Sequence, residues 1–319
     1  MLFMDTTQPF MRDDVRAFLA MVAGMNRPDI ASVPIEQTRM MMAAMQEFIQ
    51  LPGPDLAVVK DLAAPGPAGP VPLRLYDPRA ERGPSPLLVF IHGGGFVAGD
   101  IASYDATCRT IAAELDLPLV SVEYRLAPEH PFPAAPEDCE AAARWLASSP
   151  AELGRQVTGL IPLGDSAGGN LAIVVTQSLM LEPPAVPVLM QAPIYPVTDP
   201  LDPHPSYAQF AEGHLLTRST MDYFNLCYAL DPEDRRAYPV LGPIAGTPPT
   251  VLATAALDPL RDSGRAYASA LVQAGSDVTY LELAGNIHGF IQIRKAIPSA
   301  HADLLAILGA MKATLERIA

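Results

Sequence analysis

Residues 159–172, GLIPLGDSAGGNLA, decide the fold of this chain. The stretch opens as a short apolar strand and continues after Ser166 with the spacing of a helix. Between the two, GDSAG at 164–168 is a GxSxG motif, which in this context predicts a sharp strand-to-helix turn that projects the serine hydroxyl from a sheet. The following helix N-terminus favours negative charge at that point. Ser166 is therefore a candidate nucleophile.

Short apolar runs alternate with helical stretches on both sides of this motif. Such alternation is typical of βαβ units, so the sequence predicts an α/β fold with a mostly parallel sheet. The first two runs are joined by a Gly/Pro-rich turn and should form an antiparallel edge. The expected strands are 57–64, 71–77, 87–92, 118–124, 159–164, 186–194, 250–255 and 277–283. The expected helices are 103–116, 136–148, 167–181, 262–274 and 299–318.

Two segments fall outside this alternation. Residues 9–25 and 35–50 have apolar residues at helical spacing, and residues 198–245 interrupt the alternation with a helical stretch near 218–230. We expect residues 1–50 and 198–245 to pack together as one cap. The catalytic domain would then comprise 51–197 and 246–319. The methionines of the second helix could be plain core or could line an adaptable apolar pocket; they are Met40, Met41, Met42 and Met45.

A glycine run follows the strand at 87–92. It reads His92-Gly93-Gly94-Gly95-Phe96 and leaves backbone N–H groups able to point into a cavity. Such donors, with the N–H of the residue after a nucleophile, form an oxyanion hole. The run matches neither GxGxxG nor a P-loop, which argues against a nucleotide site. His92 precedes the serine, so we expect it to orient the loop rather than act as the base.

A serine hydroxyl needs an adjacent base that is itself oriented by an acid. In the α/β-hydrolase arrangement the chain order is Ser, Asp or Glu, His. His288 follows the last expected strand directly and is the candidate base, whereas His301 opens the terminal helix and should face solvent. Asp258 follows the strand at 250–255 and is the candidate acid.

Two other aspartates are alternative candidates for the acid. Asp262 has the position of a helix N-cap. Asp199 in YPVTDP could be a displaced acid but is more typical of a turn residue.

Together these residues make the chain resemble the hormone-sensitive-lipase family of bacterial esterases, in its GDSAG motif subgroup. The resemblance covers roughly residues 57–319. It rests on HGGGF at 92–96, YRLAPEHPFPAA at 124–135, GDSAGGNLA at 164–172, YP at 195–196, DPLRD at 258–262 and HGF at 288–290.

The resemblance implies an α/β-hydrolase fold with a helical cap, and a serine carboxylesterase acting on short- to medium-chain esters. It implies nucleophile Ser166, acid Asp258 and base His288. It also implies three oxyanion N–H donors, which are Gly94, Gly95 and Ala167. No metal or organic cofactor is required. One alternative is an amide or formamide hydrolase with the same triad. Another is a non-catalytic ligand receptor, since receptors of this fold exist that have lost the triad histidine.

The segment YRLAPEHPFPAA also has a structural interpretation. Arg125 and Glu129 are plausible partners in a buried ion pair, and the prolines would fix the loop that enters the next helix.

The net charge, the apolar runs and the cysteines of the chain exclude several classes of binding partner. With 319 residues and a net charge of -14, the chain lacks the clustered cations that nucleic acid or an anionic membrane surface requires. No apolar run approaches the ~18 residues that span a bilayer, and no signal peptide is visible. Three widely spaced cysteines fit buried, reduced thiols. We therefore expect a cytoplasmic protein whose partner is a small ester. The last strand could be a sheet edge that pairs a homodimer.

Overall fold

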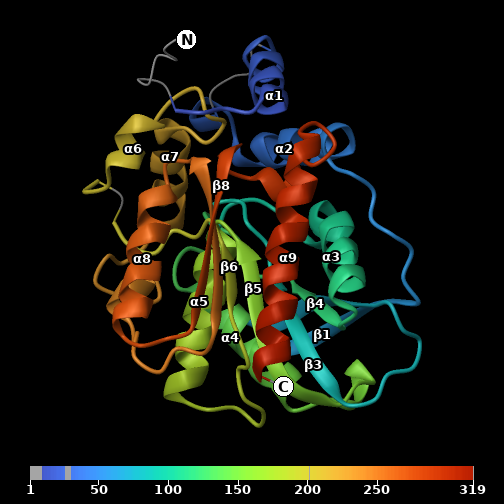
Figure 1. The fold of residues 1–319 in the computed structure, drawn as a ribbon. Coiled ribbons are helices and arrows are strands. Elements are labelled where there is room, and N and C mark those ends of the chain that lie inside the picture. The colour runs from blue at the N-terminus through green and yellow to red at the C-terminus, as the bar shows by residue number, and fades with distance from the viewer. Residues whose placement is uncertain (1–8, 26–29, 201, 319) are drawn as a thin grey trace.

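The computed structural model describes residues 9–25, 30–200 and 202–318, and in them an eight-stranded sheet lies between helices (Figure 1). The strand order is β1-β2-β4-β3-β5-β6-β7-β8. The strands are β1 (Val58–Gly66), β2 (Gly69–Asp77), β3 (Ser85–Ile91), β4 (Leu119–Val122), β5 (Val157–Asp165), β6 (Ala192–Ile194), β7 (Thr250–Leu257) and β8 (Val278–Ile287). β1 and β2 pair antiparallel, β2 pairs antiparallel with β4, and every later pairing is parallel. The predicted α/β class and antiparallel edge are confirmed.

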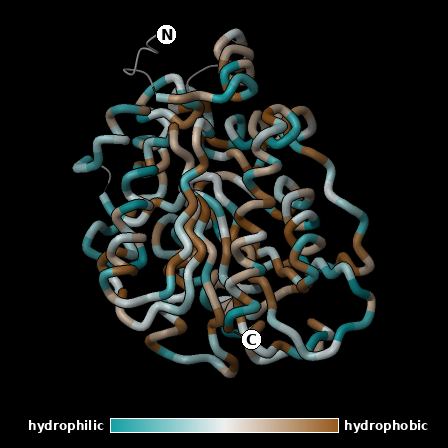
Figure 2. The backbone as a smooth tube through the Cα atoms, viewed as in Figure 1, coloured by the Kyte–Doolittle hydropathy of each residue, from teal (hydrophilic) through white to brown (hydrophobic). Residues whose placement is uncertain are grey.

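Alternate side chains of the central strands pack into two separate hydrophobic clusters, one on each face of the sheet. On β3, Leu88 and Phe90 join one cluster, whereas Leu87, Val89 and Ile91 join the other. Both faces are apolar because helices cover both, which explains why the strand reads as an unbroken apolar run. Figure 2 shows hydrophobic segments gathered along the central strands and hydrophilic ones in the outer loops.

The helices divide between the two faces. α3 (Ile101–Leu115) and α9 (Pro298–Ile318) contribute to the first core. α4 (Ala134–Ala147) and α5 (Ala167–Leu181) contribute to the second, and α8 (Arg261–Gln273) packs beside α5 in a smaller cluster. The predicted helices therefore exist, with boundaries displaced by a few residues.

Among the described residues, four further α-helices lie above the carboxyl ends of the parallel strands (Figure 1). They are α1 (Asp13–Ala23), α2 (Ile35–Ile49), α6 (Pro205–Gln209) and α7 (Arg218–Tyr228). α1 buries Val15 and Phe18 in the first core, and Tyr228 of α7 stacks on Phe96 with ring centroids 3.9 Å apart. The two segments predicted to be outside the α/β alternation thus meet the glycine loop and the sheet at one edge.

The expected strand over 186–194 is mostly wrong. Only Ala192–Ile194 forms β6, and the preceding residues make single bridges, such as Leu160 with Val188. Pro187 has no N–H to donate to a ladder, although its carbonyl accepts the Leu160 N–H at 2.9 Å. The apolar run therefore begins as a partly exposed connection, becomes buried from Met190 onward, and is a strand only over its last three residues.

The expected Arg125–Glu129 ion pair is also wrong. Arg125 instead makes a bidentate pair with Asp138 of α4 at 2.8 Å, and Asp138 also accepts the Arg125 backbone N–H. Glu129 is exposed and pairs at 2.7 Å with Arg39 of α2. α4 packs under the loop and brings a buried carboxylate that the local sequence spacing did not reveal.

The methionines of α2 fit neither single expectation. Met40 and Met42 are 65% and 37% exposed, Met41 is half-buried, and Met45 packs against the first core.

All three cysteines are free thiols; Cys108 and Cys139 are buried, while Cys227 is half-buried. No helix within the described ranges is both long and apolar enough to cross a bilayer.

Two glycine substitutions with opposite expected effects test the packing of the turn after β5. A Cβ on Gly168 would collide with the Ile91 and His92 carbonyls, whereas one on Gly309 in α9 meets no atom within 4 Å. Gly168→Ala should lower the free energy of unfolding by about 1–3 kcal/mol. Gly309→Ala should raise it by about 0.5–1 kcal/mol. Urea titration measures both, and equal effects would contradict the packing described.

Candidate active site

Ser166 sits on a strained turn between β5 and α5. Its φ of 55° and ψ of -119° lie in a region that a non-glycine residue rarely adopts. The Ser166 N–H donates to the Ile194 carbonyl at 2.9 Å, which holds the turn against β6. The predicted sharp turn is therefore present, and the hydroxyl stands at the carboxyl edge of the sheet.

The three residues predicted as a catalytic triad form one hydrogen-bonded series with His288 in the middle. His288 Nε2 is 2.9 Å from Ser166 Oγ, and His288 Nδ1 is 2.7 Å from Asp258 Oδ2. The residues follow β5, β7 and β8, whose carboxyl ends meet at this edge. If Nδ1 carries the proton that Asp258 accepts, Nε2 is left free to accept the serine proton.

Neighbouring residues hold the hydrogen-bonded series Asp258–His288–Ser166 in one geometry. Asp258 is fully buried, and its second oxygen accepts the Leu260 N–H at 2.8 Å. The His288 ring packs against Tyr195, with ring centroids 4.6 Å apart. His288 keeps 8% exposure, so the reacting edge is shielded from bulk water.

The competing residues lie elsewhere. Asp199 pairs with His204 at 2.8 Å rather than with His288. His301 is half-buried, and its Nδ1 lies 3.5 Å from the guanidinium of Arg294. Asp262 is in the first turn of α8 rather than at its N-cap, and it accepts the Ser206 N–H at 2.9 Å.

The glycine loop after β3 is a tight turn that only glycines fit. Gly94 has φ +116°, and a Cβ there would collide with Ala98. The Gly94 carbonyl accepts the N–H groups of Val97 and Ala98 at 3.1 and 2.9 Å. These bonds fix the direction in which the loop faces.

Its backbone donors divide into two kinds. The Gly93 N–H donates to Asp165 Oδ1 at 2.9 Å and to the Tyr104 hydroxyl at 3.1 Å, so it is engaged within the protein. No hydrogen bond within the described residues engages the N–H of Gly94 or Gly95. Ala167 opens α5, and first-turn N–H groups have no partner inside their helix. This division supports the expected donor set of Gly94, Gly95 and Ala167.

Residues of α7 and α2 contact the same loop and the segments that follow it. A Cβ added to Gly95 would collide with the ring of Phe224 from α7, so this ring lies directly against the glycine. Arg39 of α2 donates from Nε to the Val97 carbonyl at 2.7 Å and from Nη2 to Ala127 at 2.9 Å. No sequence motif pointed to Phe224 or Arg39, because their contacts join distant segments.

His92 orients the loop, as expected for its place before the glycines. It is fully buried, stacks on Tyr124 with ring centroids 4.2 Å apart, and places Nδ1 2.8 Å from the Gly93 carbonyl. Burial lowers the pKa of His92 to about 4. A neutral Nδ1–H can therefore donate to Gly93 throughout the neutral range.

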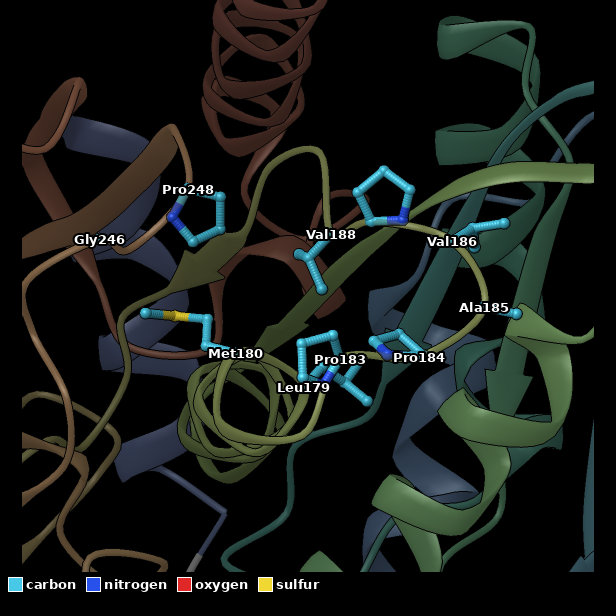
Figure 3. A pocket seen from close by; sticks show the side chains of 10 residues that line it. Leu179, Met180, Pro183, Pro184, Ala185, Val186, Val188, Gly246 and Pro248 are labelled. Carbon is cyan, nitrogen blue, oxygen red and sulfur yellow. The ribbon is translucent and has the colours of Figure 1, made fainter.

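The part of the chain that the structure describes holds no group of three or more His, Cys, Asp or Glu side chains arranged for a metal. A hollow of about 380 Å³ lies at the opposite, amino edge of the strands, between the end of α5 and the loops before β6 and β7 (Figure 3). Prolines and aliphatic side chains, among them Met180, Val188 and Pro248, line it. It carries none of the reactive groups described above.

His92 offers a pH test of this arrangement. The unfolded chain accepts a proton at His92 near pH 6.5, and the folded chain does so only near pH 4. Protonation thus favours unfolding, and this histidine should reduce stability as pH falls from about 6.5 towards 4. We expect the nitrogen NMR signals of the His92 ring to stay those of a neutral imidazole from pH 8 to 5. A midpoint near 6.5 would contradict the burial.

Similarity to known proteins agrees with this geometry. Residues 88–292 match a family model described as alpha/beta hydrolase fold. Carboxylic ester hydrolase LipN of Mycobacterium tuberculosis is 40% identical over 279 residues, which cover 84% of this chain and 74% of LipN. An ethyl acetate hydrolase of Pseudomonas putida is 36% identical over 248 residues, covering 76% and 78% of the two chains.

A solved structure extends the likeness to the whole fold. An ester hydrolase from the metagenome of Lake Arreo, complexed with a derivative of bipyridine phosphonate, superposes with a TM-score of 0.90 at 35% identity. The match covers 96% of this chain and 100% of the other. Family model, relatives and fold together show that the chain belongs to the hormone-sensitive-lipase-like family of α/β-hydrolase-fold enzymes.

Proposed function

We propose that this chain is a serine carboxylesterase that hydrolyses short- to medium-chain carboxylic esters through an acyl-enzyme. The observation that carries the proposal is the hydrogen-bonded series Asp258–His288–Ser166, which ends beside unengaged N–H groups of the glycine loop. The relatives named carboxylic ester hydrolase and ethyl acetate hydrolase support the same bond type.

The reaction follows from the roles of these atoms. His288 Nε2 takes the Ser166 proton while Oγ bonds to the ester carbonyl carbon, and the carbonyl oxygen becomes an oxyanion. The N–H groups of Gly94, Gly95 and Ala167 donate to it; each such donor is typically worth about 2.7–4 kcal/mol in the transition state. The carbon–oxygen bond then breaks, and His288 protonates the leaving alkoxide. Water, deprotonated by His288, repeats the attack and frees the acid and Ser166.

The helices above the strand ends supply the boundary of the site. We propose that residues 1–50 and 198–245 act as the cap on a catalytic domain of 51–197 and 246–319. The contact of Phe224 with Gly95 supports this, because it brings α7 against the loop that would hold the oxyanion. The cap would then limit the acyl group that fits beside Ser166.

Two further features stay predictions. β8 ends the sheet as an edge strand, so a homodimer joined along it is expected, and size-exclusion chromatography with light scattering tests it. A cytoplasmic location is expected from the sequence and is tested by cell fractionation.

Replacing the nucleophile tests the mechanism. Ser166→Ala should reduce turnover of p-nitrophenyl acetate to the background rate, because no other hydroxyl lies 2.9 Å from His288 Nε2 in the described residues. Circular dichroism should stay unchanged, and a fluorophosphonate probe should label the wild type only. Near wild-type turnover by Ser166→Ala would contradict the proposal. Absence of labelling in the wild type would favour a ligand receptor instead.

The acyl preference tests the cap. In a series of p-nitrophenyl esters, kcat/KM should peak at short or medium chains and fall beyond about ten acyl carbons, as expected for a pocket of ordinary size. Phe224→Ala should shift the optimum to longer chains. A wild-type optimum at long chains would contradict this assignment. Matched esters and amides of the same acyl group distinguish an esterase from an amidase.

A further inference from the structure

A second buried carboxylate lies next to the nucleophile and takes no part in the triad. Asp165 is 2% exposed, and it accepts hydrogen bonds from three different elements of the site. Gly93 of the glycine loop donates its N–H at 2.9 Å. Tyr104 of α3 and Tyr195 after β6 donate their hydroxyls to the other oxygen at 3.2 Å each.

The energetic setting of this group is unusual. In the part of the chain that the structure describes, no Lys or Arg forms an ion pair with Asp165. Burial raises the pKa of Asp165 to about 6, against the opposing influence of His288, Gly93 and the two tyrosines. A buried carboxylate held only by neutral donors is costly to stability, so a scaffold role alone does not explain it.

Two of the three partners of Asp165 adjoin the proposed reaction centre, and the third, Tyr104, bonds to one of these two. Gly93 immediately precedes the two candidate oxyanion donors, and its N–H also donates to the Tyr104 hydroxyl at 3.1 Å. Tyr195 packs on the His288 ring. The Asp165 carboxylate therefore restrains both the glycine loop and Tyr195, whose ring packs against the candidate base His288.

The hydrogen bond of the Gly93 N–H is one of the restraints on the glycine loop, together with the contact of His92 with the Gly93 carbonyl and the bonds to the Gly94 carbonyl. Gly94 and Gly95 have φ of +116° and +62°, and glycines in such conformations can rotate with little steric hindrance. If the Gly93 N–H lost its acceptor, one of these restraints would be gone, and rotation of the Gly93–Gly94 peptide group could move the Gly94 N–H away from the oxyanion. Asp165 is positioned to prevent this rotation.

We propose that Asp165 is a positioning residue that fixes the oxyanion loop through the Gly93 N–H and supports His288 through Tyr195. The proposal rests on the esterase function proposed above. It assigns Asp165 an effect on the transition state and little effect on binding of the substrate, since its carboxylate contacts neither Ser166 Oγ nor His288 directly in the hydrogen-bond network.

Asp165→Asn tests this on the full chain. The side chain keeps its shape but loses charge and one acceptor, so kcat for p-nitrophenyl acetate should fall about 10- to 100-fold, less than the ~10²–10³ expected when an oxyanion donor is removed outright. KM should change less than about threefold. The inhibition constant of a trifluoromethyl ketone, whose adduct carries an oxyanion, should rise in parallel with the fall in kcat/KM.

Two variants separate this role from general loss of stability. Asp77→Asn alters another fully buried carboxylate, which is paired with Arg82 at 2.8 Å at the opposite edge of the sheet, and it should leave kcat unchanged in the folded fraction. Tyr104→Phe removes one hydroxyl that contacts both Asp165 and Gly93, and it should lower kcat about 3- to 10-fold. If Asp165→Asn does not fold, Tyr104→Phe carries the test.

The outcomes are distinct from those for the esterase itself. If Ser166→Ala is inactive but Asp165→Asn, or failing that Tyr104→Phe, keeps wild-type kcat and ketone affinity, the positioning role is wrong and the esterase stands. A rise in KM with unchanged kcat would also overturn it. If Ser166→Ala stays active, the proposed function itself fails.

Discussion

The close approach of α5 to β3 is the constraint on which the site depends. Gly164 and Gly168 both face the Ile91 carbonyl at a distance that leaves no room for a side chain. Because the helix can begin directly against the sheet, β5 turns into α5 within one residue and Ser166 takes its strained conformation. The same approach sets the first turn of α5 beside the glycine loop after β3, so hydroxyl and backbone donors face one small space.

Parallel strands then bring the distant residues together. Ser166 and His288 are 122 positions apart in sequence, yet β5, β6, β7 and β8 are adjacent in the sheet and end at the same edge. Each loop at that edge has to supply only one group in the right direction. This is why functional residues on such folds collect beyond the carboxyl ends of the strands, and why the hollow at the amino edge has none of this chemistry.

Features whose determinants are local in the chain could be predicted from the sequence. GDSAG is a strand, a turn and a helix start in one stretch, and the order of Ser166, Asp258 and His288 along the chain follows from strand ends. Contacts whose partners come from another element could not be predicted in this way. Arg125 bonds to Asp138 of α4 rather than to its sequence neighbour Glu129, and the apolar run at 186–194 forms a strand only at its buried end. Neither result is encoded in spacing along one segment.

Asp165 departs from the apolar pattern of its own strand because its hydrogen-bond donors come from other elements. An acidic residue at the end of a buried strand conflicts with the apolar pattern of β5, and its burial opposes ionisation. Its three donors come from α3, the glycine loop and the segment after β6, so the conflict is resolved only after the tertiary structure has formed. Asp165 does not stabilise one element by itself but restrains several elements at once. Those elements surround the space above Ser166, and the proposed role of Asp165 is to keep them in place around it.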